Sequence, residues 1–124
     1  MTWRLVSWGA LAIVVFDALA SVASRTLGFS YGYATVGSWL IYAVFGFMIG
    51  RRANVGAASL GVAIIAVVEA TIGWAVSWAI GPGRPPKGTP SIGILATTVV
   101  LVAFTGAIIG ALTGVLGRRW PTLA

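Results

Sequence analysis

Four long apolar runs constrain the fold of this chain more than any other feature. They lie near residues 5–27, 33–50, 54–80 and 91–117. A helix rises 1.5 Å per residue, so about 20 apolar residues are needed to cross a hydrocarbon core of about 30 Å. Each run is close to that length or longer. The sequence therefore predicts an all-α integral membrane protein, a single membrane domain over residues 1–124 whose four transmembrane helices form a bundle in the lipid bilayer.

The composition supports this prediction and removes several kinds of chemistry. Hydrophobic residues make up 59% of the chain, charged residues make up 8%, and the mean hydropathy is +1.01, all far from the values of soluble domains. The chain has no Cys and no His. This excludes thiol chemistry, disulfides, haem ligation and the usual zinc or copper sites, so we expect no metal and no cofactor.

The basic residues predict an orientation. The apolar runs are separated by turns at 28–32 and 51–54 and by an outer loop at 81–90. Five basic residues fall on one side, namely Arg4, Arg51, Arg52, Arg118 and Arg119. Three fall on the other side, namely Arg25, Arg84 and Lys87. Because short cytoplasmic segments are enriched in Lys and Arg, both termini are expected in the cytoplasm, with the protein in the plasma (inner) membrane. The margin of two charges leaves dual insertion open.

The net charge of +6 does not predict a nucleic-acid partner. The basic residues stand at the ends of the apolar runs rather than in one patch. At these positions they are expected to contact lipid headgroups.

The two halves of the chain resemble each other. Residues 14–18 align with 66–70, and residues 45–52, which end in Gly-Arg-Arg, align with 112–119. Each half is thus a helical hairpin, over 5–52 and over 54–119. Two spans separate the copies, so both hairpins enter the membrane in the same direction, as parallel repeats do. We expect them to be related by a twofold-like axis near the membrane normal.

Asp17 and Glu69 are the only acidic residues, and each lies near the middle of an apolar run. A charged side chain at that depth costs about 2.5–3.5 kcal/mol on insertion scales, so both are expected inside the bundle, sharing one interior site. Arg25 stands eight residues from Asp17, about 12 Å along a helix, which is too far for a pair. At neutral pH the two acids are expected to hold at least one proton between them.

Small and polar residues continue from each acid toward the outer side at helical spacing. They predict a half-channel to the acids, formed by Asp17, Ser21 and Ser24 in the first run and by Glu69, Gly73 and Ser77 in the third. Trp74 and Trp78, with Tyr31, are expected near the outer interface. The two tryptophans are interpreted as interfacial anchors, with an aromatic cage for an organic cation as the alternative.

Glycines recur every fourth residue in the second and fourth runs. Gly46 and Gly50, and Gly106, Gly110 and Gly114, are expected to let helices pack closely. The alternatives are a seam between copies in a homo-oligomer and a lining that leaves room for a solute.

Three functions fit these features, and the sequence is assigned to no family. The leading hypothesis is a small transport protein that binds protons or a cation at Asp17 and Glu69. The second is an intramembrane enzyme, an isomerase or cyclase, whose two carboxyls act as general acid and base on a lipophilic substrate. The third is an accessory subunit of a larger membrane complex, in which the acids only fix helix packing. An open polar path favours transport, a closed apolar pocket favours catalysis, and no cavity favours the subunit.

Overall fold

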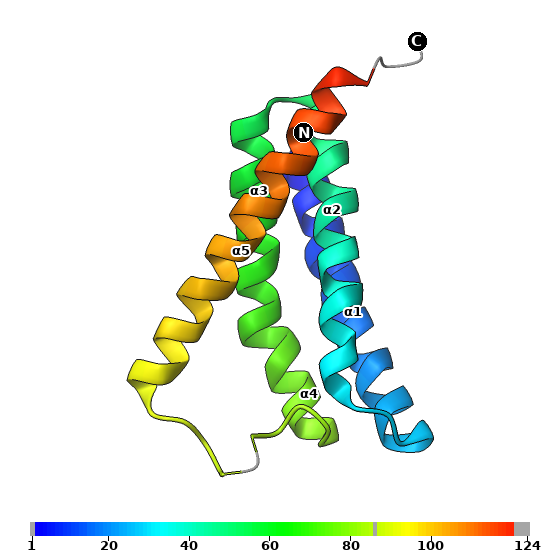
Figure 1. Cartoon of the computed structure of the whole chain (residues 1–124), viewed down its shortest axis with the longest axis vertical. Coiled ribbons are helices and arrows are strands. Elements are labelled where there is room, and N and C mark those ends of the chain that lie inside the picture. Colours follow the sequence, from blue (N-terminus) through cyan, green and yellow to red (C-terminus); the bar gives the residue numbers. More distant parts are fainter. Residues whose placement is uncertain (1, 86, 121–124) are drawn as a thin grey trace.

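The computed structural model describes residues 2–85 and 87–120, and every regular element in these ranges is helical (Figure 1). In chain order they are α1 (Thr2–Leu27), the 3-10 turn η1 (Tyr31–Tyr33), α2 (Ala34–Arg52), α3 (Val55–Val68), the π-helical turn η2 (Glu69–Gly73), α4 (Trp74–Ile80) and α5 (Ile92–Arg119). The elements α3, η2 and α4 follow one another without a break, so they form one span, Val55–Ile80. The prediction of an all-α bundle with four membrane-spanning helices is confirmed.

Local chemistry explains where the helices begin and end. Gly28 and Gly81 follow the ends of α1 and α4 with φ of 78° and 127°, a conformation that side chains other than glycine rarely adopt. The Asn54 side chain accepts a hydrogen bond of 2.7 Å from the Ala57 N–H at the start of α3. Ser91 caps α5 in the same way. These residues lie at the ends of the apolar runs, which is why the limits of the helices could be predicted.

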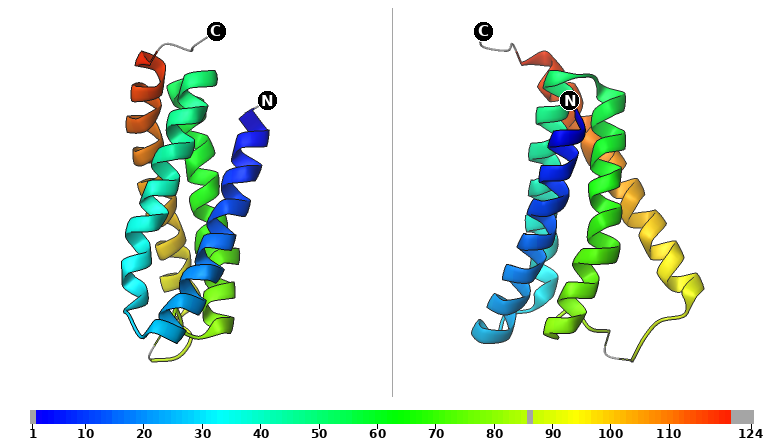
Figure 2. Two further views of the ribbon diagram at one scale, coloured as in Figure 1. Left: turned by 90° about the vertical axis from the view of Figure 1, so that its right-hand side faces the viewer. Right: turned by 180° about the vertical axis from the view of Figure 1, so that it is seen from behind.

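The helices surround one core. α1 begins and α5 ends at one end of the bundle, called here the terminal end, and residues 81–91 connect α4 to α5 at the opposite, long-loop end (Figures 1 and 2). α1 packs on α2 and α3, and α5 packs on the same two helices from the other side. Over the described residues, α1 and α5 do not pack against each other.

Glycines bring α5 against α2 and α3 in its second half. The only buried residues of α5 are Gly106, Gly110, Gly114 and Gly117. A Cβ atom on Gly46 of α2 would stand 3.0 Å from Gly110 Cα, and one on Gly50 would collide with the Gly114 backbone. The close approach therefore depends on the absence of side chains here, as the glycine spacing predicted.

The first half of α5 leaves the bundle. None of its residues from 92 to 105 is buried, and the helix diverges from α3 and α4 toward the long-loop end (Figure 1 and the right-hand view of Figure 2). By contrast, Ile13, Ile49, Val62 and Ile65 are fully buried closer to the terminal end. The bundle is thus closely packed between α2, α3 and the second half of α5, and open beside α5 at its long-loop end. At the terminal end a cavity of about 800 Å³ lies beside the start of α1.

Candidate functional site

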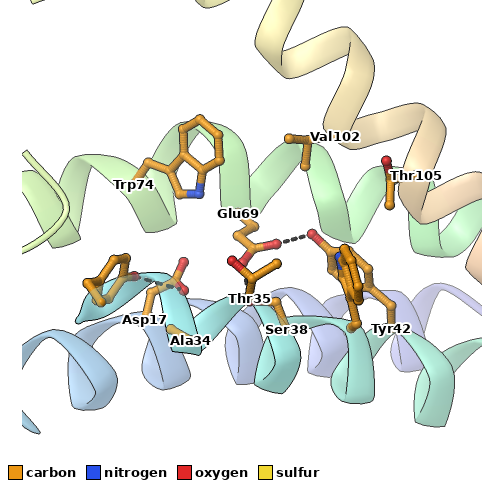
Figure 3. A pocket seen from close by; sticks show the side chains of 11 residues that line it. Asp17, Ala34, Thr35, Ser38, Tyr42, Glu69, Trp74, Val102 and Thr105 are labelled. Atoms are coloured by element: carbon orange, nitrogen blue, oxygen red, sulfur yellow. Dashed lines mark hydrogen bonds between the residues drawn. The ribbon is translucent and has the colours of Figure 1, made fainter. Parts of the chain in front are cut away.

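Asp17 of α1 and Glu69 of η2 line the same cavity, although each is buried, with 1% and 6% of its surface exposed. The cavity has a volume of about 230 Å³ and is called here the acid cavity. Its hydroxyl groups come from Tyr31, Thr35, Ser38, Tyr42 and Thr105. Figure 3 shows the two carboxyls facing this space, with the Trp74 ring near one end and Tyr42 near the other.

A glycine allows the two acids to approach each other. Gly73 lies one turn after Glu69 and is buried against α1. A Cβ atom at Gly73 would collide with Asp17 Oδ2 and would stand 3.7 Å from Glu69 Cγ. Both acidic side chains therefore flank one point on the helix, and any larger residue there would separate them.

The Glu69 carboxyl is held on both oxygens by α2. The Ser38 hydroxyl donates to Oε1, and the Tyr42 hydroxyl donates to Oε2. Both donors are buried and lie one helical turn apart. Neither donor was predicted from the sequence, yet a pattern marks both. Ala34, Ser38, Tyr42 and Gly46 form a stripe of every fourth residue on α2.

The Asp17 carboxyl is only partly satisfied. The Tyr31 hydroxyl donates to Oδ1 at 3.3 Å, so Tyr31, expected at the outer interface, reaches inward from η1. Asp17 Oδ2 is buried and has no hydrogen-bond partner among the described residues. The two acids, which align in the sequence, therefore have different surroundings.

No basic side chain in the described ranges neutralises either acid. Arg25 donates instead to the Ile80 carbonyl at 2.8 Å, and Arg84 donates to the Trp78 carbonyl at 2.9 Å. Both arginines thus bind carbonyls at the end of α4, where cations interact favourably with the helix dipole. The acid cavity contains two carboxyls and no positive charge from the described chain.

A second cavity adjoins the first toward the outer loop. This loop cavity has a volume of about 330 Å³ and shares Tyr31, Thr35 and Trp74 with the acid cavity. It is also lined by Gly83 and Pro85 in the outer loop. Because they share these walls, the two cavities adjoin each other between α2, α4 and α5, and the loop cavity lies on the side of the long-loop end.

The residues of the predicted half-channel divide into two groups. Ser77, Trp74 and Trp78 line the loop cavity. Ser21 and Ser24 are buried on α1 and line neither of the two cavities. Ser24 donates to the Phe29 carbonyl at 2.7 Å, which ties the end of α1 to the following turn.

The π-helical turn η2 begins at Glu69 itself. A π-turn inserts a residue into a helix and locally changes the direction of its side chains, and such turns are frequent at functional sites. The segment Glu69–Gly73 contains no Pro, and the π-turn was not predicted from the sequence.

The arrangement suits the binding of a proton or a cation. One carboxyl is fully hydrogen-bonded, the other has a free oxygen, and indole rings of Trp39 and Trp74 complete the wall. It also suits proton exchange with an uncharged substrate. No protein-family model, no curated protein and no solved structure matches this chain, so its function is argued from the site itself.

Proposed function

We propose that this protein is a small membrane transport protein that binds protons or a small cation at Asp17 and Glu69. One observation carries the proposal. Two buried carboxyls from different spans line one cavity, and this cavity adjoins a second one that reaches the outer loop. Ionisable groups inside a membrane bundle usually mark an ion or substrate pathway. The lack of a pairing cation in the described chain leaves their charge for a solute.

The packing at the terminal end supports a gated path rather than an open pore. Ile13 and Ile65 are fully buried one turn from the two acids on that side, and the glycine contacts of α2 with α5 lie beyond them. Transport therefore requires a second state in which this end opens. α5 is a suitable moving element, because only its second half is buried.

We further propose that the terminal end faces the cytoplasm and that the protein lies in the inner membrane. The start of α1, the turn between α2 and α3 and the end of α5 all lie at the terminal end. The five basic residues of these segments therefore share one side, against three on the other. This difference favours cytoplasmic termini.

An intramembrane acid–base enzyme is the second candidate. It is favoured by a third cavity, of about 240 Å³, which lies between α4 and α5 and is lined by Trp74, Trp78 and aliphatic residues such as Val99. A lipophilic substrate could reach the carboxyls from the side through this space. In that case Asp17 and Glu69 would exchange protons with the substrate, and no net ion movement would occur.

The two amide variants Asp17→Asn and Glu69→Gln test the transport proposal. Each keeps the shape of the side chain and removes its exchangeable charge. In proteoliposomes under an imposed membrane potential, internal pH and Na⁺ uptake are followed with entrapped dyes. We expect ion movement by the wild type and its loss in both variants, with thermal stability retained.

Two results would contradict the proposal. The first is wild-type ion movement no faster than that of empty vesicles, which would favour the enzyme. The second is unchanged movement in both amide variants, which would leave the acids with a packing role.

A further inference from the structure

Three buried oxygen atoms beside Asp17 lack hydrogen-bond partners. They are Asp17 Oδ2, Ser21 Oγ and Ser77 Oγ, and their residues are exposed by only 1%, 0% and 1%. In the part of the chain that the structure describes, no other buried side-chain oxygen or nitrogen is in this state. Buried polar groups are almost always paired, so three neighbouring exceptions mark a place where a further polar ligand would be stabilised.

These atoms converge because α1 and α4 pack through small residues. Ser21 lies one turn after Asp17 on α1, and Ser77 lies one turn after Gly73 on α4. The Tyr31 hydroxyl bonds Asp17 and also lies close to Ser21 and Ser77. One carboxylate and three hydroxyls, from α1, η1 and α4, thus surround one point.

A ligand can reach this point through the two cavities. Asp17 and Tyr31 line the acid cavity, and Tyr31 and Ser77 line the loop cavity. Three members of the cluster thus border the adjoining cavities, whereas Ser21 is buried beside them on α1. A solute entering from the long-loop end would pass Ser77 and Tyr31 before it reached Asp17.

The chemistry of the cluster selects the ligand. All of its groups are oxygens, which suit hard cations. None of its four residues is basic, so nothing in the cluster itself favours an anion. Only one carboxylate is available, since Ser38 and Tyr42 already hold Glu69. A single negative charge balances a monovalent ion, whereas divalent cations usually bind where several carboxylates meet.

We propose that Asp17, Ser21, Tyr31 and Ser77 form a binding site for Na⁺. The site deepens the proposed function, because it names a cation for the transport path and rests on that function for the claim that the ion is carried. Glu69 then holds a proton, so that the bound ion is balanced by the single negative charge of Asp17.

Ion-dependent thermal unfolding tests the binding itself. The purified full-length protein is heated in detergent at fixed pH and ionic strength, with NaCl replaced stepwise by choline chloride or KCl. A ligand that binds only the folded state raises the melting temperature with its concentration. We expect a rise in NaCl that choline does not produce and that K⁺ produces only at higher concentration.

Serine variants show whether the effect arises at this cluster. Ser21→Ala and Ser77→Ala each remove one oxygen, and we expect each to raise the Na⁺ concentration for half-maximal effect about tenfold or more, as lost ligand-shell contacts do. Asp17→Asn should abolish the effect. In choline chloride the two serine variants should be at least as stable as the wild type, because an unpaired buried hydroxyl is removed. A purely structural role would instead make them less stable in every salt.

Ser59→Ala is the matched control. Ser59 is half-buried on α3 and donates to the Ala107 carbonyl at 2.9 Å, away from the cluster. Its Na⁺ response should equal that of the wild type. The proposal is overturned if Na⁺ and choline act alike, which would mean that buried water completes the cluster, or if both cluster serine variants keep the wild-type Na⁺ response.

The binding and transport results separate the two proposals. Loss of ion movement in Asp17→Asn without any Na⁺-specific stabilisation leaves the transport function in place and removes the Na⁺ site. Na⁺-specific stabilisation without ion movement leaves the Na⁺ site in place and removes the transport function.

Discussion

At the scale of single residues, the two acids differ in how completely they are bonded. Glu69 accepts two hydrogen bonds from α2, while Asp17 accepts one from Tyr31 and keeps one oxygen without a partner in the described chain. A carboxyl with both oxygens occupied is fixed in position, whereas one with a free oxygen can take a ligand. On this difference rests the proposal that Asp17 binds the ion while the partners of Glu69 hold that carboxyl in position.

The Tyr42→Phe variant tests how firmly α2 holds Glu69. It removes the hydroxyl bound to Oε2 and leaves a buried acceptor unpaired, because Tyr42 is only 2% exposed. We expect a loss of about 1–2 kcal/mol in the free energy of unfolding, between values for helix contacts in membranes and for buried groups in soluble proteins. Tyr33→Phe is the control, since Tyr33 is 73% exposed and should change stability little. Equal melting temperatures for the two variants would argue that the Tyr42 bond adds nothing.

The sequence predicted the acids but not their partners. A lone acid in an apolar run is visible in any membrane sequence, because its cost at that depth demands an explanation. Ser38, by contrast, is an ordinary small polar residue in the sequence, and only the folded structure shows that it contacts Glu69. Tyr31 was expected at the interface because aromatic residues gather there, and only the fold of η1 brings its hydroxyl to Asp17.

At the scale of helices, α5 forms one side of the proposed path. Its glycine-rich second half is buried against α2 and α3, and its first half stands away from α4. The loop cavity lies in the space between them, with Ile94, Leu95 and Thr98 on its α5 side. A change confined to this side should therefore affect passage without touching the acids.

The Thr98→Trp variant should obstruct the path. Thr98 lines the loop cavity, and its hydroxyl bonds only the Ile94 carbonyl of its own helix. The introduced indole ring is therefore expected to enter the cavity, of about 330 Å³, without breaking a contact between helices. We expect ion movement to fall nearly to the level of Asp17→Asn, with Na⁺ stabilisation retained.

Thr97→Trp is the matched control for this variant. Thr97 is exposed, bonds the Gly93 carbonyl of its own helix and does not line the loop cavity. It should leave ion movement unchanged. If both tryptophan variants transport as the wild type does, the path does not run through the loop cavity.

The limits of the helices could be predicted, but their shape could not. Glycines with positive φ and capping side chains act locally, so the ends at Gly28, Asn54, Gly81 and Ser91 follow from neighbouring residues. The divergence of α5 and the π-turn η2 depend on packing between distant segments. No local pattern in 69–73 or 92–105 encodes them.

At the scale of the whole molecule, the contacts of α2 with α5 match what the aligned halves require. Gly46 meets Thr113, its own aligned position, while Gly50 meets Gly114. In return Gly117, the position aligned with Gly50, meets Phe47, the position aligned with Gly114. Reciprocal contacts of this kind arise around a twofold axis. The repeat of the complete hairpins remains a prediction.

The bundle departs from this symmetry at the acids. α2 packs on α3, but in the described ranges the equivalent packing of α1 on α5 is missing. Extending the alignment along the helices without a gap makes Thr105 the counterpart of Ser38. Ser38 bonds Glu69, whereas Thr105 bonds the Leu101 carbonyl of its own helix and faces the acid cavity. The acid cavity thus lies where the bundle departs from the symmetry of its aligned halves.

The orientation of the whole molecule can be tested with single cysteines, because the natural chain has none. Ala53→Cys at the terminal end and Thr89→Cys in the outer loop leave the number of basic residues unchanged. With a membrane-impermeant maleimide we expect Thr89→Cys to react in intact cells and Ala53→Cys to react only after permeabilisation. Labelling of both sites in intact cells would indicate dual insertion.

The charge difference that sets this orientation is small enough to be removed. Five basic residues oppose three, so replacing Arg51 and Arg52 with Gln makes the two sides equal. In this background the terminal-end cysteine should become partly reactive in intact cells, because some molecules would insert in the opposite direction. Arg84→Gln is the control, since it widens the difference and should leave the labelling as in the natural chain. If the double variant keeps a single orientation, Arg51 and Arg52 do not determine it, and the outer loop with its four prolines becomes the stronger candidate.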